Sequence, residues 1–152
     1  MIFVSHAIAV NEPGVIYLDR ADIWDGLVRK ANNALPFVPA MSGCVVTQRH
    51  SDTVFDRDIE IRGEPFTERI TLEAPHRVVF TRLSGTVLGT IANEIIGDGD
   101  GMELRFSFAL VIAGVTGGST EEADFAAGMT ADYLGAVTAT LAAIRKVAEE
   151  AA

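Results

Sequence analysis

Cysteine, histidine and basic residues are all scarce in this 152-residue chain, and each scarcity excludes a class of protein or site. The single cysteine, Cys44, cannot form an internal disulfide, so we expect a reducing compartment and predict a cytoplasmic protein. Three histidines are present, and no pair of His or Cys residues has the spacing of zinc ligands. We therefore expect no bound metal, and no motif of the chain indicates a cofactor.

Lysine and arginine together number 12 against 21 acidic residues, which gives a net charge of −9. Nucleic acids and anionic membranes are bound by clusters of basic side chains, so neither is an expected partner. The longest strongly apolar run, near Phe108–Val115, is too short to span a bilayer, and the N-terminus lacks the basic segment of a signal peptide. The expected partners are neutral or apolar small molecules, or another protein.

Proline is absent from the stretch Ser119–Glu150, which has the pattern of one long helix. Ser119 and Glu122 form the sequence signature of a capping box at its start. At about 1.5 Å per residue, such a helix is about 45 Å long and needs an equally long apolar surface to cover. Its apolar stripe consists of Phe125, Ala126, Met129, Tyr133, Val137, Leu141, Ile144 and Ala148.

The preceding chain is dominated by alternating patterns that predict strands. A strand at Ile2–Val10 is followed by an amphipathic helix at Asp19–Asn32, and Pro36–Pro39 brackets a short second helix or a tight connection. Six further strands are predicted at Ser42–His50, Val54–Arg62, Phe66–Glu73, Arg77–Leu83, Val87–Ile96 and Met102–Ile112.

Short turns between consecutive strands predict an antiparallel meander. We expect a single α+β domain over residues 1–152, with a curved sheet of about seven strands, two short helices after the first strand and the long C-terminal helix on its concave face. A curled sheet that grips a helix leaves a hollow between them, and small molecules bind in hollows of this kind.

Short motifs spread over the whole chain accompany this order of elements: Val10-Asn11, Leu18, Trp24, Gly26-Leu27, Phe37-Val38-Pro39, Cys44, Val46, Arg57, Ile59, Glu68-Arg69-Ile70, Pro75, Arg77-Val78, Asn93-Glu94-Ile95, Glu103-Leu104 and Phe106. With them the chain resembles the START-like superfamily, also called SRPBCC, which has the helix-grip fold of the birch-pollen allergen. It is most similar to the AtaL-like group of that superfamily. The resemblance implies a cavity for hydrophobic ligands such as lipids, sterols, polyketides or hormones. Some members are aromatases, cyclases or dehydratases, so the resemblance does not choose between carrier and enzyme.

Arg57 and Glu68 each lie on an otherwise apolar strand face. A tight turn at Gly63-Glu64 would place Ile59 opposite Glu68, which makes Arg57 and Glu68 diagonal neighbours on the inward face. A lone buried charge is very costly, whereas a paired one is tolerated. The pair is therefore either the polar end of a ligand pocket, an ion pair that sets the sheet register, or two groups in water.

Glu94 belongs to the next predicted hairpin. Pairing Gly97 with Gly101 would place Glu94 opposite Leu104, also on the inward face. A glutamate left partly unpaired in such a cavity would have a raised pKa and could act as a general acid or base. No catalytic residue is assigned, and Glu68 and Glu94 are the candidates.

Two further polar residues are candidates for the pocket. His6 lies among apolar residues. It is either a proton donor in the pocket or, as is more common for such a residue, a hydrogen-bonded core histidine. Tyr133 has a phenol for which a ligand could be the partner, and Arg82 could join the cluster, although the Pro75 turn leaves its face undecided. The apolar candidates, which pack as plain core in the alternative interpretation, are Trp24, Phe37, Phe55, Ile59, Ile70, Phe106, Phe108, Met129 and Val137.

The favoured hypothesis is a non-enzymatic protein that binds a small hydrophobic ligand (a lipid, polyketide or aromatic metabolite) between the sheet and the C-terminal helix. The second is a cyclase or dehydratase of the polyketide type with Glu68 or Glu94 as acid/base, which requires an inward carboxylate free of Arg57. In the third hypothesis, side chains fill the cavity, and the protein acts through its surface, for example as a homodimer.

Overall fold

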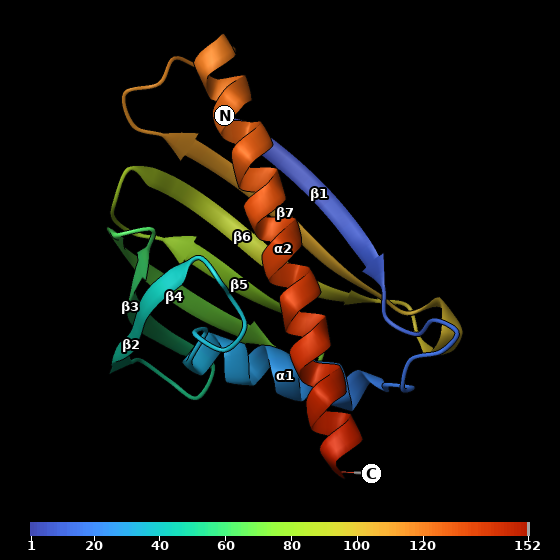
Figure 1. Ribbon diagram of the computed structural model, residues 1–152. Coiled ribbons are helices and arrows are strands. Elements are labelled where there is room, and N and C mark those ends of the chain that lie inside the picture. Colours follow the sequence, from blue (N-terminus) through green and yellow to red (C-terminus); the bar gives the residue numbers. More distant parts are fainter. Residues whose placement is uncertain (152) are drawn as a thin grey trace.

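Seven strands and two α-helices make up the computed structural model, which describes residues 1–151 (Figure 1). The helices are α1 (Arg20–Asn32) and α2 (Thr120–Ala151), and a short 3-10 turn, η1, covers Gly99–Gly101. The strands are β1 (Ile2–Ala9), β2 (Met41–Arg49), β3 (Val54–Ile61), β4 (Glu64–Glu73), β5 (Arg77–Arg82), β6 (Val87–Ile96) and β7 (Glu103–Ile112). Every predicted strand is present, and no predicted bound of a strand differs by more than two residues.

The strands form one antiparallel sheet in the order β1-β7-β6-β5-β4-β3-β2. After β1 the chain leaves the sheet through α1 and returns at the opposite edge with β2, so β1 and β2 are the two edge strands. Figure 1 shows α2 laid diagonally across the curved sheet, with α1 crossing near the C-terminal end of α2. This is the predicted helix-grip arrangement.

Helix α1 starts at a reciprocal cap. The N–H of Asp22 donates to Asp19 Oδ1 at 2.8 Å, and the N–H of Asp19 donates to Asp22 Oδ2 at 2.9 Å. The second short helix predicted after β1 is absent from the described chain, and turns replace it between residues 35 and 40. The N–H groups of Phe37 and Val38 both donate to Ala34 O at 2.9 Å, and Pro36 has no N–H to extend the turn.

The start of α2 is capped in a different way from the prediction. The N–H of Glu122 donates to Ser119 Oγ at 3.1 Å, as expected, but the Glu122 carboxylate does not return to the Ser119 N–H. It accepts instead from Gly118 N at 3.1 Å and from the N-terminal amine of Met1 at 2.8 Å. This carboxylate thus ties the beginning of β1 to the beginning of α2.

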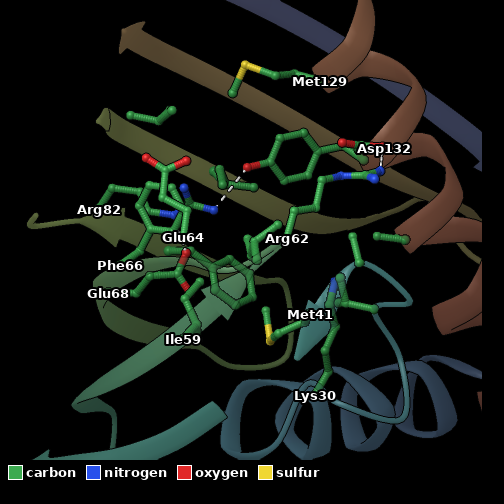
Figure 2. A pocket seen from close by; sticks show the side chains of 18 of the residues that line it. Lys30, Met41, Ile59, Arg62, Glu64, Phe66, Glu68, Arg82, Met129 and Asp132 are labelled. Atoms are coloured by element: carbon green, nitrogen blue, oxygen red, sulfur yellow. Dashed lines mark hydrogen bonds and ion pairs between the residues drawn. The ribbon is translucent and has the colours of Figure 1, made fainter. Parts of the chain in front are cut away.

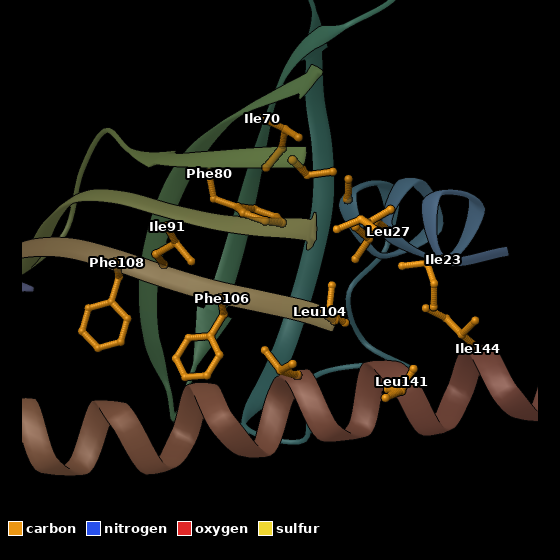
Figure 3. Close-up of a cluster of buried hydrophobic side chains, with 14 of the residues drawn as sticks. Ile23, Leu27, Ile70, Phe80, Ile91, Leu104, Phe106, Phe108, Leu141 and Ile144 are labelled. Atoms are coloured by element: carbon orange, nitrogen blue, oxygen red, sulfur yellow. The ribbon is translucent and has the colours of Figure 1, made fainter. Parts of the chain in front are cut away.

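The hydrophobic core extends along the sheet face that α2 covers, from Phe108 to Ile23 and Ile144 (Figure 3). Leu141 and Ile144 of α2 pack with Leu104 of β7 and with Ile23 of α1. The buried residues of α2 all follow Gly135: Ala136, Val137, Thr140, Leu141 and Ile144. No residue in the N-terminal half of α2 is fully buried, and Phe125, Met129 and Tyr133 of this half line a cavity between the helix and the sheet.

Gly26 of α1 packs directly against the side chain of Ile144 of α2. A Cβ added at Gly26 would lie 2.3 Å from Ile144 Cγ1, so Gly26→Ala should push α1 away from α2. We expect a loss of about 1–3 kcal/mol in the free energy of unfolding, measured by urea titration. Gly128→Ala is the control, because its Cβ meets nothing within 4 Å and should add about 0.5–1 kcal/mol through helix propensity. Equal stability of the two variants would contradict this close contact.

Candidate ligand-binding cavity

A cavity of about 270 Å³ lies between the sheet and the N-terminal half of α2 (Figure 2). Its walls come from α1, β3 to β6, the segment 38–41 and α2, and most of the lining side chains are apolar. At its edge an exposed ion pair of 2.7 Å joins Arg62 of the β3–β4 turn to Asp132 of α2. Two other hollows, one between α1 and the end of α2 and one on the outer face of the sheet, have no buried charged residue in their lining.

Glu68 is held by two arginines at one side of the cavity. Arg57 donates from Nε and Nη2 to Glu68 Oε1 at 3.1 and 2.9 Å, and Arg82 donates from Nε to Oε2 at 2.7 Å. Burial disfavours the charged form of Glu68, but the Arg57 and Arg82 guanidinium groups outweigh it and hold the pKa of this carboxyl below its usual value. With both oxygens occupied, Glu68 is an ionised structural partner.

Arg57 also closes the end of α1. Its Nη1 donates to the carbonyl oxygens of Lys30 and Ala31, both at 2.9 Å, which lie in the last turn of the helix and have no helical N–H partner. All three of its guanidinium nitrogens are therefore engaged within the protein. Arg57 joins β3, β4 and α1, and it has little capacity left to anchor a ligand.

Arg82 and Tyr133 retain capacity to donate hydrogen bonds. Arg82 Nη2 donates to the Tyr133 hydroxyl at 3.2 Å, whereas Arg82 Nη1 has no hydrogen bond within residues 1–151. Burial raises the pKa of Tyr133 to about 12, so the phenol stays protonated and its own hydrogen remains free to donate. Both residues line the cavity.

Lys30 and Asn93 form a second polar pair on the cavity wall, which the sequence analysis missed. Lys30 Nζ donates to Asn93 Oδ1 at 2.7 Å, and both residues are buried. Burial, and secondarily the nearby charge of Arg57, lower the pKa of Lys30 to about 7. Figure 2 shows Lys30 extending from α1 toward the cavity.

A sequence signal for this pair existed. Lys30 lies seven residues after Ile23 and three after Leu27, on the apolar stripe of α1. Asn93 lies between Ile91 and Ile95 in the alternation of β6, at an inward position. Polar residues at positions that the periodicity assigns to the core are the pattern that would have identified them.

Six of the predicted pocket residues line the cavity, and the other eight lie elsewhere. Those in the lining are Arg57, Glu68, Tyr133, Ile59, Met129 and Val137. Phe55, Ile70, Phe106 and Phe108 are buried in the core. Phe106 and Phe108 support the ring of Tyr133 at centroid distances of 6.4 and 4.9 Å, so they contribute indirectly.

Glu94 was predicted to point inward, and this is wrong. The β6–β7 hairpin pairs Glu94 with Arg105 rather than with Leu104, and Arg105 Nη2 donates to Glu94 Oε1 at 2.9 Å. The 3-10 turn η1 lengthens the loop and moves the register by one residue. Since side chains alternate in direction along a strand, that shift turns Glu94 to the outer face and Asn93 to the inner one.

His6 is not a core histidine, and it does not line the cavity. It stacks on Phe106 with ring centroids 5.6 Å apart, but the residue is exposed because β1 is an edge strand. Trp24 is half-buried against the core, and Phe37 lies in the hollow between α1 and the end of α2. Both were expected at the cavity, and neither belongs to its lining.

Cys44 is half-buried, and its Sγ accepts a hydrogen bond of 3.5 Å from Ala34 N. Among residues 1–151, no three His, Cys, Asp or Glu side chains gather as they would around a metal ion. Over the same range, no helix is both long and apolar enough to cross a bilayer.

Solved structures share this fold at low sequence identity. The Zhui aromatase/cyclase from Streptomyces sp. R1128 has a TM-score of 0.66 and 15% identity, covering 97% of this chain and 93% of that chain. A START superfamily protein from Mycobacterium smegmatis has a TM-score of 0.64 and 15% identity, covering 97% and 99%. Ara h 8.0201 has a TM-score of 0.64 and 10% identity, covering 93% and 96%. These similarities establish the helix-grip fold and do not by themselves assign an activity.

A search of curated proteins finds no significant match to this sequence. A family model does match, over residues 4–151, and its description is AtaL, acetylaranotin biosynthesis cluster protein L. The match spans nearly the whole chain and agrees with the resemblance found in the sequence motifs. The chain therefore belongs to the AtaL family.

Proposed function

We propose that this protein binds one small, largely hydrophobic molecule bearing a carbonyl or hydroxyl oxygen in the cavity beneath α2, and that it acts as a carrier. The observation that supports this most is the combination of an apolar cavity with unused donors on Arg82 and Tyr133. Apolar walls favour a hydrophobic ligand by about 25 cal/mol per Å² buried, and buried donors favour an acceptor oxygen.

The size of the cavity limits the ligand. At about 270 Å³ the cavity falls just below the range of roughly 300–1,000 Å³ that is usual for small-molecule sites. A compact molecule of one or two rings, or a short chain, suits this volume. Aromatic metabolites fit this description better than a complete lipid or an extended polyketide.

The carrier is favoured over an acid/base enzyme because the two candidate carboxylates are unsuited to proton transfer. Glu68 is paired through both oxygens, and its pKa is lowered by Arg57 and Arg82 in spite of burial. Glu94 lies on the outer face of the sheet. Glu64, which is also in the lining, accepts a hydrogen bond from the Thr86 hydroxyl. The cyclase or dehydratase hypothesis would need a different proton donor.

The test is binding of one- and two-ring aromatic alcohols and ketones, including 2-naphthalenemethanol, measured by calorimetry after native mass spectrometry has identified any molecule that copurifies. Met129→Trp places an indole in the lining and should weaken binding by about tenfold or more. Leu134→Trp is the matched control on the exposed side of α2, and it should leave affinity unchanged.

Two results would contradict the proposal. One is equal affinity of both tryptophan variants, which would place the binding site away from the cavity. The other is a clean apo mass together with no binding by any compound of the panel, which would favour a protein that acts through its surface.

A further inference from the structure

The buried charges beside the cavity do not balance. Lys30, Arg57 and Arg82 are cationic side chains, and Glu68 is the one anionic side chain buried with them in the described chain. Both Glu68 oxygens are taken by the two arginines. Lys30 forms no ion pair within residues 1–151, and its hydrogen-bond partner Asn93 is neutral. Lys30 is therefore the cation without an anion.

An excess buried positive charge is relieved by loss of a proton, and of these three residues only lysine can lose one. Desolvation, together with the charge of Arg57, accounts for a pKa of about 7 at Lys30, with Glu68 acting in the opposite direction. Relative to an exposed lysine, the fraction of free amine at pH 7 increases on the order of a thousandfold. A neutral primary amine on a cavity wall is a nucleophile.

We propose that Lys30 forms a Schiff base with an aldehyde or ketone bound in the cavity, so that the protein captures carbonyl compounds reversibly and covalently. This inference rests on the proposed function, because the carbonyl compound must first occupy the cavity. It adds a chemical class of ligand, an aromatic or short-chain aldehyde or ketone, and a covalent step.

The step is balanced without an oxidant or a metal. The Lys30 nitrogen lone pair forms a bond to the carbonyl carbon while the C=O π bond breaks, and a proton passes from nitrogen to oxygen to give a carbinolamine. The C–O bond then breaks, water leaves, and an imine remains; hydrolysis reverses the sequence. Asn93 Oδ1 orients the amine, and the donors of Arg82 and Tyr133 lie in the same cavity as partners for a carbonyl oxygen.

The chain offers a simple labelling experiment because it has only two lysines, Lys30 and Lys146, besides the N-terminal amine of Met1. The full-length protein is incubated at pH 7 with 2-naphthaldehyde and cyanoborohydride, which reduces an imine to a stable amine. Intact mass counts the naphthylmethyl groups added, and peptide mapping locates them. We expect Lys30 to be labelled at least about tenfold faster than Lys146, with a rate that rises through a midpoint near pH 7.

Controls separate the cavity from general amine reactivity. Lys30→Met should lose the fast label, whereas Lys146→Met, at an exposed position, should keep it. Saturating 2-naphthalenemethanol, which has no carbonyl, should protect Lys30 and leave Met1 reactive. Because mapping and protection are measured on the unmodified sequence, the test does not depend on folding of Lys30→Met.

The outcomes distinguish the two proposals. If 2-naphthaldehyde competes with 2-naphthalenemethanol for binding but labels only Lys146 and Met1, the Schiff-base inference is wrong and the carrier proposal stands. If neither compound binds and Lys30 is unlabelled, both proposals fail. Labelling of Lys30 that 2-naphthalenemethanol does not prevent would also overturn the inference, since the amine would then react without an occupied cavity.

Discussion

Replacing Glu68 by glutamine is expected to lower the free energy of unfolding by about 3–5 kcal/mol. Glu68→Gln keeps the shape of the side chain but leaves the guanidinium groups of Arg57 and Arg82 buried without an anion. For a chain of this length, such a loss corresponds to a fall of roughly 10–15 °C in the melting temperature. Thermal and urea unfolding followed by circular dichroism at pH 7 measures both quantities.

Glu94→Gln is the matched control. Both glutamates were candidates for the inner face of the sheet, and in the structure only Glu68 lies there. Glu94 forms one partly exposed ion pair with Arg105, so its loss should cost less than about 1 kcal/mol.

The pH dependence of the effect of Glu68→Gln on stability provides a second criterion. The pKa of Glu68 is lowered from 4.5, so its stabilising effect is present above that pH and is lost as the pH falls through the folded value. The difference between the unmodified protein and Glu68→Gln should therefore shrink in acid, and a difference that is constant with pH would argue against the pair.

The second large effect concerns Lys30 and alkaline pH. In the unfolded chain Lys30 holds its proton up to about pH 10.5, whereas in the folded protein it loses the proton near pH 7. Between these values the unfolded state binds more protons, so the free energy of unfolding increases with pH. Relative to Lys30→Met, the unmodified protein should gain on the order of 3 kcal/mol between pH 7 and pH 10.

The measurement is urea unfolding at several pH values in that window for the unmodified protein, Lys30→Met and Lys146→Met. Lys146 is exposed, so its variant should follow the unmodified protein at every pH. If the free energy of unfolding changes with pH in the same way for the unmodified protein and for Lys30→Met, Lys30 remains protonated in the folded protein. This experiment tests the neutral amine without any ligand and is independent of the labelling result.

The two hairpins show how far sequence reasoning about the site could go. At the β3–β4 turn, Arg62 and Gly63 have φ values of 50° and 80° and form a two-residue loop, which pairs Arg57 directly with Glu68. The predicted register was wrong there by two residues. Since the side-chain period of a strand is also two, both residues still point inward in spite of the register, and of the three alternatives only the one with both groups in water is excluded.

At the β6–β7 hairpin the predicted register was wrong by only one residue, but this error changed which side chains face the cavity. A register shift of one residue reverses the faces, so Glu94 points outward and Asn93 points inward. Loop geometry sets this register, and the 3-10 turn at Gly99–Gly101 has no signature that distinguishes it from a simpler turn in the run of glycine and aspartate. On β6, the polar residue that lines the cavity is therefore Asn93 and not the predicted Glu94.

By itself, the sequence determined the helix-grip fold, the positions of its strands, and the place of Tyr133 on the apolar stripe of α2, because alternation and helical periodicity are local properties. It left open whether Arg57 and Glu68 face the cavity or water. Only the tertiary structure decided which charges neutralise one another. Residues 57, 68 and 82 come from three strands and meet on one carboxylate, which leaves Lys30 of α1 with a neutral partner. Pairing of this kind depends on distances between elements far apart in the chain, and the chemistry available in the cavity depends on it.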